Sequence, residues 1–254
     1  MNYRIGIVAG IKNDVEMVEP FIEHHLKLGF TKIHLMDFNS TDGTKDILLR
    51  YQNHPQVEVE LSPYNHGVPI LQQQLRLRAY RDPDIDYLFY LDLDEFVVIA
   101  PNHSLQSVLN ETPSPCYYID RFNIMLPHAI KQGLSDNILN NLHRCAYYTP
   151  YSMESIISYP ILPEVTWREW IQNQTISGKI LHQITSQGVQ VNLGGHLAFG
   201  PTITEALMPS NIFIAHIPVS TYSRMIQKLE SYQSLIDENP TVFQGFIPRY
   251  YYLC

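Results

Sequence analysis

Two aspartates lie at the end of the most apolar stretch of the chain, residues 86–100, which read DYLFYLDLDEFVVIA. In a continuous β-strand, Asp92 and Asp94 would point to the same face, ~6.6 Å apart along the strand. Unpaired carboxylates this close repel each other unless a cation lies between them. Solvated acidic side chains at a strand end are the simpler alternative, but apolar residues on both sides disfavour it, because buried charges need partners. The segment therefore predicts a divalent-metal site.

The ligand types indicate which metal this site would bind. Carboxylate oxygens with room for water and phosphate suit Mg²⁺ or Mn²⁺, whereas zinc favours His and Cys. Such a metal would also neutralise a diphosphate, so we interpret Asp92 and Asp94 as a metal–diphosphate site. Glu95 would point to the opposite face of a regular strand, and we expect it to be structural or to support the metal ligands.

The order of elements in the first hundred residues predicts an α/β fold. Apolar runs predict strands at 3–9, 31–37 and 57–61 and another within 86–100, and helical spacing predicts helices between them. This alternation is typical of a parallel sheet with helices on both faces. The predicted helices are 15–28, capped by Asp14, ended by Gly29 and delayed or kinked by Pro20, then 45–52 and 68–80.

Three polar clusters fall where ligands bind in such sheets, at the carboxyl ends of the strands. They are residues 12–14, 37–42 and 92–94, and one crevice would hold all three. Asp37 directly ends an apolar strand and is the better ligand candidate, whereas Asp42 is expected to cap the following helix.

The pattern becomes irregular after residue 100, as in binding loops or lids. We expect a single domain over 1–254, with 1–100 as the ligand-binding half and 101–254 as the acceptor-side half. Predicted elements of the second half are a helix at 104–111, strands at 116–126, 178–184, 189–193 and 211–217, and a helix at about 221–235.

Composition excludes several classes of protein. The net charge is −8, from 17 Lys and Arg and 25 Asp and Glu, which argues against a nucleic-acid partner. Three scattered cysteines predict neither a disulfide framework nor a thiolate zinc site, and favour a reducing, cytoplasmic location. No run reaches ~18 apolar residues, so we expect no transmembrane segment. The aromatic ending FIPRYYYLC leaves peripheral membrane contact open, and also allows that the chain is a piece of a longer protein.

The motifs KND, PFIEHHLKLGF, HLMDFNSTDGT and YLDLDEFVV follow one another in the first hundred residues. In this order and spacing they resemble family-2-like glycosyltransferases with a GT-A fold, and the resemblance covers roughly residues 3–230. The later segments SGKIL, GGHLAF and AHIPVSTYSRMIQKL are similar to the Lys, His and His-x-Pro segments of a subgroup related to family 92. The resemblance implies a Rossmann-like, mostly parallel sheet with a smaller C-terminal acceptor-side portion. It also implies a Mn²⁺- or Mg²⁺-dependent enzyme of polysaccharide biosynthesis. Such an enzyme transfers a sugar from a nucleotide-sugar donor to a glycan or glycolipid acceptor, usually with inversion.

The resemblance also implies roles for individual residues. Asp92 and Asp94 match the DxD motif that holds the metal and the donor, and Asp37 matches an acidic residue that contacts the nucleoside. Residues 12–14 match a Lys-Asn-Glu motif, with Lys12 and Asn13 on the donor side and Asp14 in place of Glu. Pro20 and Ile217 depart from the pattern, standing where Glu and Tyr are common.

Other site residues come from the later motifs and the irregular segment. Lys179 would steady the donor phosphates or be a solvated strand residue, and either His196 or His216 would complete the metal site. A general base for the acceptor hydroxyl is expected among the downstream acids, with Glu154 favoured and Asp120 next. The pair His24 and His25 on the first helix is expected to be structural.

Two alternatives stay open at the level of the sequence. FYLDLDEF also resembles the start of haloacid-dehalogenase-like phosphatases, but Phe96 stands where these have Thr or Ser, and their motif lies on the first strand. A nucleotide-sugar-binding protein without transfer activity would keep the acidic motif and lack the base.

Overall fold

The structure is a computed structural model that describes residues 1–64, 75, 78–125, 146–147, 178–184, 190–192, 194–200, 206–217, 224 and 230. These residues divide into two compact units. The first contains the described residues up to 121 and those from 178 to 216, and the second contains 122–125, 146–147, 217, 224 and 230. The prediction of one domain over 1–254 stays a prediction.

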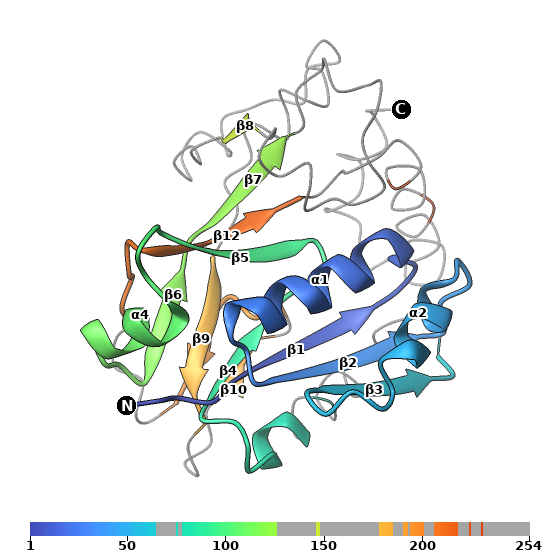
Figure 1. Ribbon diagram of the computed structural model, residues 1–254, viewed down its shortest axis with the longest axis horizontal. Coiled ribbons are helices and arrows are strands. Elements are labelled where there is room, and N and C mark those ends of the chain that lie inside the picture. Colours follow the sequence, from blue (N-terminus) through green and yellow to red (C-terminus); the bar gives the residue numbers. More distant parts are fainter. Residues whose placement is uncertain are drawn as a thin grey trace. The chain divides into compact units, whose positions relative to one another are not determined.

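A six-stranded sheet forms the first unit, in the order β3-β2-β1-β4-β9-β6 (Figure 1). The four strands from β3 to β4 pair in parallel, whereas β9 runs antiparallel to both β4 and β6. The predicted α/β class with a mostly parallel sheet is therefore confirmed. The strands are β1 (Ile5–Ile11), β2 (Lys32–Phe38), β3 (Val57–Ser62), β4 (Tyr87–Tyr90), β6 (Cys116–Ile119) and β9 (Lys179–Gln183).

Both faces of the sheet are buried. Val8 of β1 packs with Leu75 and Ala79, two helical residues from the segment predicted as a helix over 68–80. Ile5 and Ile7 point to the opposite face by strand alternation and are equally buried. This burial on both sides is the reason that β1 is a continuous apolar run. Residues 68–74 and 76–77 lie outside the described residues.

Helix α1 (Val15–Leu28) lies in front of the sheet in Figure 1 and contacts α2 (Thr44–Arg50) and β5 (Glu95–Ile99). It ends as predicted at Gly29, whose φ of 98° is left-handed. The expected delay at Pro20 does not occur, because the helix already begins at Val15. Asp14 makes no side-chain cap, which corrects that prediction. Asp42 takes this role instead, because its Oδ2 accepts the Val15 N–H at 3.1 Å.

The apolar stretch around the DxD motif is two strands joined by a turn, which corrects the prediction of one strand. β4 ends at Tyr90, and β5 (Glu95–Ile99) leaves the parallel sheet to pair antiparallel with β12 (Ile212–His216). The Glu95 N–H donates to the Asp92 carbonyl at 3.0 Å and closes the turn. Asp92 and Asp94 therefore share a turn and not a strand face.

The remaining elements are short. Helix α4 (Leu105–Glu111) begins with a capping box in which Ser104 accepts from the Ser107 N–H. Two pairs of strands are antiparallel, β10 (Gln190–Val191) with β11 (Ala198–Phe199), and β7 (Arg121–Met125) with β8 (Ala146–Tyr147). The helix predicted at 221–235 lies outside the described residues except for residues 224 and 230.

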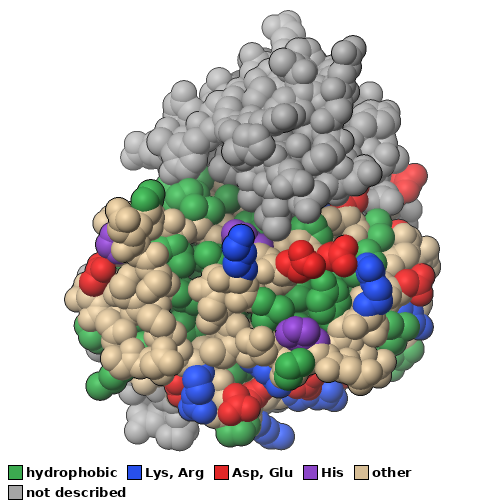
Figure 2. All heavy atoms as spheres, in the orientation of Figure 1, with side chains coloured by type: hydrophobic (Ala, Val, Ile, Leu, Met, Phe, Trp, Pro, Cys, Tyr) green, Lys and Arg blue, Asp and Glu red, His purple; other side chains and the backbone are tan. Residues whose placement is uncertain are grey.

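The sequence predicts neither a nucleic-acid partner nor a transmembrane segment, and the charges of the surface and the lengths of the helices are relevant to these two predictions. On the face seen in Figure 2, basic and acidic side chains of the described residues lie intermixed. Within the described ranges, none of the helices combines the length and apolar character needed to cross a bilayer.

The pair His24 and His25 bonds α1 to β5. The His24 Nε2–H donates to the Val97 carbonyl at 2.7 Å, and the Val97 N–H donates to His25 Nε2 at 3.3 Å. The other ring nitrogen of His25 donates to the Phe21 carbonyl at 2.8 Å, so these bonds assign the neutral Nδ1–H tautomer. These contacts give both histidines the structural role that the sequence predicts.

We expect the free energy of unfolding to decrease as the pH falls below about 6.5. Burial lowers the pKa of His25 well below its ordinary value and that of His182 to about 4. As the pH falls towards 4, the unfolded chain therefore binds protons that the folded chain excludes. Stability present above the unfolded pKa is then lost, by up to about 1.4 kcal/mol per pH unit for each group. Urea denaturation from about pH 7.5 to about pH 5 measures this decrease.

Two variants identify the source of this pH dependence. His25→Leu should show a smaller decrease than the wild type, whereas His54→Leu, in the turn before β3, should keep the full decrease. An identical decrease in all three proteins would contradict the role of His25.

Candidate active site

The three predicted polar clusters lie at one edge of the sheet. They follow β1, β2 and β4, which are neighbouring parallel strands whose carboxyl ends share that edge. The first two loops bond to each other directly. The Asn13 N–H donates to Ser40 Oγ at 2.8 Å, and the Thr41 N–H donates to Asn13 Oδ1 at 2.9 Å. Lys12 Nζ donates to the Asn39 carbonyl at 2.6 Å, so this part of the edge is preformed.

Asp37 and Asp42 hold the second loop. Asp37 is buried near the end of β2, and its Oδ2 accepts the Ser40 N–H at 3.1 Å. Asp42 Oδ1 accepts the N–H of Thr44, the first residue of α2, at 3.0 Å, but Gly43 is the N-cap of this helix, so Asp42 lies one residue before the predicted cap position. Because Asp42 also bonds α1, one carboxylate fixes the amino ends of two helices beside the site.

Lys179 joins the acidic turn to the rest of the sheet. Its side chain is only 2% exposed, and its Nζ lies 2.8 Å from Asp92 Oδ2 and 3.2 Å from Glu95 Oε2. A further bond of 2.8 Å goes to the Gly194 carbonyl. The solvated-strand alternative for Lys179 is therefore wrong, because β9 pairs with β4 and places this lysine beneath the turn.

Glu95 is the buried centre of this network, with a side chain that is 0% exposed. Its Oε2 accepts the Asp92 N–H at 2.9 Å, and its Oε1 pairs with Arg121. The carboxylate thus holds the turn from below, in the structural role that the sequence predicts. Sequence reasoning missed Arg121. A basic residue two positions after the apolar strand CYYI was the available signal, since a charge at such a position needs a partner.

The ion pairs decide how these groups titrate. Burial raises the pKa of Glu95, and the nearby Lys179 and Arg121 oppose that rise without cancelling it. For Asp92 the surrounding protein would raise the pKa, but the Lys179 ammonium outweighs that effect and lowers it. Burial would lower the pKa of Lys179, but the carboxylates of Asp92 and Glu95 outweigh burial and raise it. Asp92 and Lys179 therefore stabilise each other as charged groups.

Asp94 faces a histidine from the neighbouring strand. The pairing of Glu95 with His216 brings β12 alongside, and His216 Nε2 lies 3.6 Å from Asp94 Oδ1. The two side chains offer an oxygen and a nitrogen ligand to the same space. Asp92 lies in the same turn and its side chain is 63% exposed, but one of its oxygens contacts Lys179.

The acidic turn does not contain a closed set of three metal ligands. Within the part of the chain that the structure describes, the one trio with ligand atoms within 4.8 Å of one another is His34, Glu58 and Asp82. His34 is in β2 and points, by strand alternation, to the face opposite that of Asp37.

His196 differs from His216 in its contacts. Its Nδ1 donates to the Gly178 carbonyl at 2.7 Å, and its N–H donates to Asn192 Oδ1 at 2.7 Å. Gly195 precedes it with a φ of 71°, and a Cβ there would lie 2.5 Å from Tyr90 Cβ at the end of β4. The glycine thus allows this loop to approach the site. Of the two histidines, His216 is the one that contacts Asp94.

Of the two proposed bases, Asp120 and Glu154, the structure describes only Asp120. Asp120 is exposed and follows β6, where Ile119 pairs with Lys179, so it lies at the same edge of the sheet. The backbone carbonyl of Asp120 accepts the Ile214 N–H at 2.8 Å, and the carboxylate takes no part in that hydrogen bond. Glu154 lies outside the described residues.

Comparison with known proteins gives a family and a set of solved structures. The sequence model of "Glycosyltransferase family 92" matches residues 5–153. The chain is similar to the crystal structure of S. aureus TarS 1–349, with 16% identity and a TM-score of 0.42, over 71% of this chain and 47% of that one. The same TarS fragment in complex with UDP matches at 17% identity, over 52% and 38% of the two chains, with a TM-score of 0.38. Its complex with UDP-GlcNAc matches at 16% identity, over 52% and 37%, also with a TM-score of 0.38.

The chain covers less than half the length of each of these TarS chains. Among curated proteins, none matches the chain.

Removal of the Lys179 charge should destabilise the protein. Lys179→Met leaves the buried carboxylate of Glu95 with Arg121 alone, and uncompensated buried charges cost roughly 3 kcal/mol or more. We expect a loss of this size in urea denaturation. The double variant Lys179→Met/Glu95→Gln should recover only part of it, because the buried carboxylate charge is then gone while Arg121, 11% exposed, keeps its charge without Glu95. The matched control is Lys45→Met at an exposed position of α2. Equal stability of the two single variants would contradict this account.

Proposed function

Because the chain belongs to glycosyltransferase family 92, we propose that it transfers a sugar from a nucleotide-sugar donor to a hydroxyl group of a glycan or glycolipid. The observation that carries this proposal is the acidic turn at residues 91–94, fixed by Glu95 and Lys179 at the carboxyl edge of a parallel sheet. Donors with phosphate groups bind at this edge in related α/β folds. Family membership disfavours the phosphatase alternative.

A divalent cation fits the residues of the turn. Asp94 and His216 offer ligand atoms 3.6 Å apart, and the exposed side chain of Asp92 lies in the same turn. The acids Asp92, Asp94 and Glu95 outnumber the bases Lys179 and Arg121 there, which favours an added cation. Mn²⁺ or Mg²⁺ held by Asp94 and His216 would act as a Lewis acid that stabilises the departing diphosphate. This geometry makes His216 a better ligand candidate than His196.

The residues around the turn would orient the donor. We assign Asp37 and the loop of Lys12 and Asn13 to the nucleoside side, because they border the same edge. For Lys179, its bonds to Asp92, Glu95 and Gly194 favour positioning of the turn over direct contact with donor phosphates.

Transfer also requires a base for the acceptor hydroxyl. In a single displacement, the base takes the proton as the acceptor oxygen attacks the anomeric carbon, and the configuration inverts. Asp120 is our candidate among the described residues because it is exposed at the same edge as Lys179, and Glu154 is the other candidate. Assignment of the acceptor to residues 101–254, the cytoplasmic location and peripheral membrane contact also belong to this proposal.

The decisive experiment measures donor binding and transfer together. Thermal unfolding is followed with a panel of nucleotide-sugars with and without Mn²⁺, because ligands that bind the folded state raise the midpoint. We expect a metal-dependent increase for the wild type and no increase or transfer for Asp94→Asn. Asp46→Asn, exposed on α2, serves as the matched control and should behave as the wild type.

Each outcome of this experiment is informative. Full transfer by Asp94→Asn would reject the role of the turn. A metal-dependent increase in the midpoint without transfer to any acceptor would favour a binding protein over an enzyme.

A further inference from the structure

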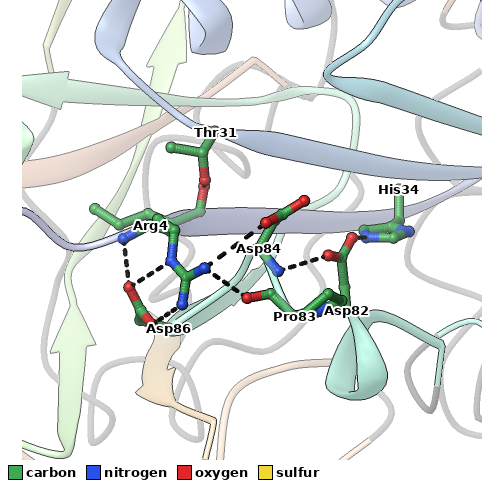
Figure 3. A network of polar contacts seen from close by, with 8 residues as sticks. Arg4, Thr31, His34, Asp82, Pro83, Asp84 and Asp86 are labelled. Atoms are coloured by element: carbon green, nitrogen blue, oxygen red, sulfur yellow. Dashed lines mark hydrogen bonds and ion pairs between the residues drawn. The ribbon is translucent and has the colours of Figure 1, made fainter.

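His34 lies between two carboxylates, away from the acidic turn. Its side chain is 2% exposed, its Nε2 lies 3.1 Å from Asp82 Oδ2, and its Nδ1 lies 3.3 Å from Glu58 Oε2. Glu58 comes from β3, which pairs with β2 so that His34 and Glu58 are direct neighbours. Figure 3 shows the ring of His34 pointing toward Asp82.

Asp82 is held in place by the surrounding turn. Its Oδ1 accepts the Asp84 N–H at 2.9 Å, so Oδ2 remains directed at His34. Arg4 holds this turn in place. Its guanidinium donates hydrogen bonds to both carboxylate oxygens of Asp86, at 2.7 and 3.1 Å, and to the Pro83 carbonyl at 2.6 Å (Figure 3). Asp82 is therefore a preset acceptor for the Nε2–H of His34.

This bond determines what the other ring nitrogen can do. If Nε2 carries the proton, Nδ1 presents a lone pair, and it is buried without a hydrogen-bond partner. It faces the carboxylate of Glu58, so two electron-rich groups lie 3.3 Å apart. Such a pair needs a cation between its members. A histidine that donates one N–H to a carboxylate and turns its other nitrogen to a metal is the usual arrangement of metal-binding histidines.

We propose that His34 Nδ1 and Glu58 bind a Zn²⁺ ion and that Asp82 orients the imidazole. The separation of 3.3 Å between the two ligand atoms lies at the lower end of the edge lengths of about 3.3–3.6 Å expected for a tetrahedral zinc with bonds of ~2.0–2.2 Å. Imidazole suits zinc, whereas Mg²⁺ and Ca²⁺ prefer oxygen ligands. Glu58 is 49% exposed, so water has access to the remaining positions.

The site is separate from the proposed donor site. His34 and Asp37 are three residues apart on β2, ~10 Å along the strand, and point to opposite faces. The ion would join β3, the edge strand of the sheet, to β2 and to the turn before β4. It would thus stabilise the sheet by binding only the folded chain.

Zinc titration of the full chain, without donor, tests the proposal. Competition with a fluorescent chelator should give one zinc ion per chain in the Asp94→Asn background, which removes the other carboxylate–histidine pair, and zinc should raise the midpoint of thermal unfolding. We expect Glu58→Gln and His34→Gln to weaken zinc binding at least about tenfold, and Asp82→Asn by roughly 10–100-fold, the usual effect of a residue that orients a ligand. Glu60→Gln, on the same face of β3 and paired with Arg78, is the matched control and should bind normally.

Asp94→Asn separates this site from the proposed donor site. It should keep the zinc ion, so a failure of the proposed function leaves this result unaffected. Unchanged zinc affinity in both Glu58→Gln and His34→Gln, or loss of zinc only in Asp94→Asn, would overturn the proposal. It would also be overturned if ¹⁵N NMR found both nitrogens of His34 protonated with zinc present, because an imidazolium would then bridge the two carboxylates. Glu58 is half-exposed, so its substitution tests binding without emptying the core.

Discussion

The acidic turn depends on a buried set of opposite charges. Glu95 is inaccessible to solvent, and it holds the Asp92 backbone, Lys179 and Arg121 at once. Burial of a carboxylate is costly, and an ion pair offsets that cost only when its geometry is good and its remaining hydrogen bonds are satisfied. The network therefore contributes less to the stability of the fold than to the conformation of the turn, because it leaves the turn few alternatives. A turn fixed before the ligand arrives loses less entropy on binding.

The same network lies where the chain passes from one sheet to another. β4 belongs to the parallel sheet and β5 to an antiparallel pair, and the chain must change sheets within four residues. Glu95 is the first residue of β5, and Lys179 is the first residue of β9, which pairs with β4. Their contact fastens the two sheets to each other where the acidic side chains emerge.

The first hundred residues were predictable because their elements are local. Strand and helix periods alternate there, and β1, β2 and β3 each pair with a strand close in sequence. The turn at 91–94 was not predictable, because the alternation of Leu91 and Leu93 with acidic residues continues the pattern of a strand across the change of sheet. The environment of Lys179 required the pairing of β9 with β4, some ninety residues apart, which no local pattern indicates. Likewise, Asp42 replaces Asp14 at the start of α1 because a loop distant in sequence lies there.

The histidine pair on α1 has a consequence for association between molecules. β5 is the outer strand of its sheet, and outer strands present backbone groups that can recruit a strand from another chain. At Val97 both backbone groups are already occupied by imidazoles, one as donor and one as acceptor. The helix thereby imitates a neighbouring strand at that residue and protects an apolar edge from intermolecular aggregation.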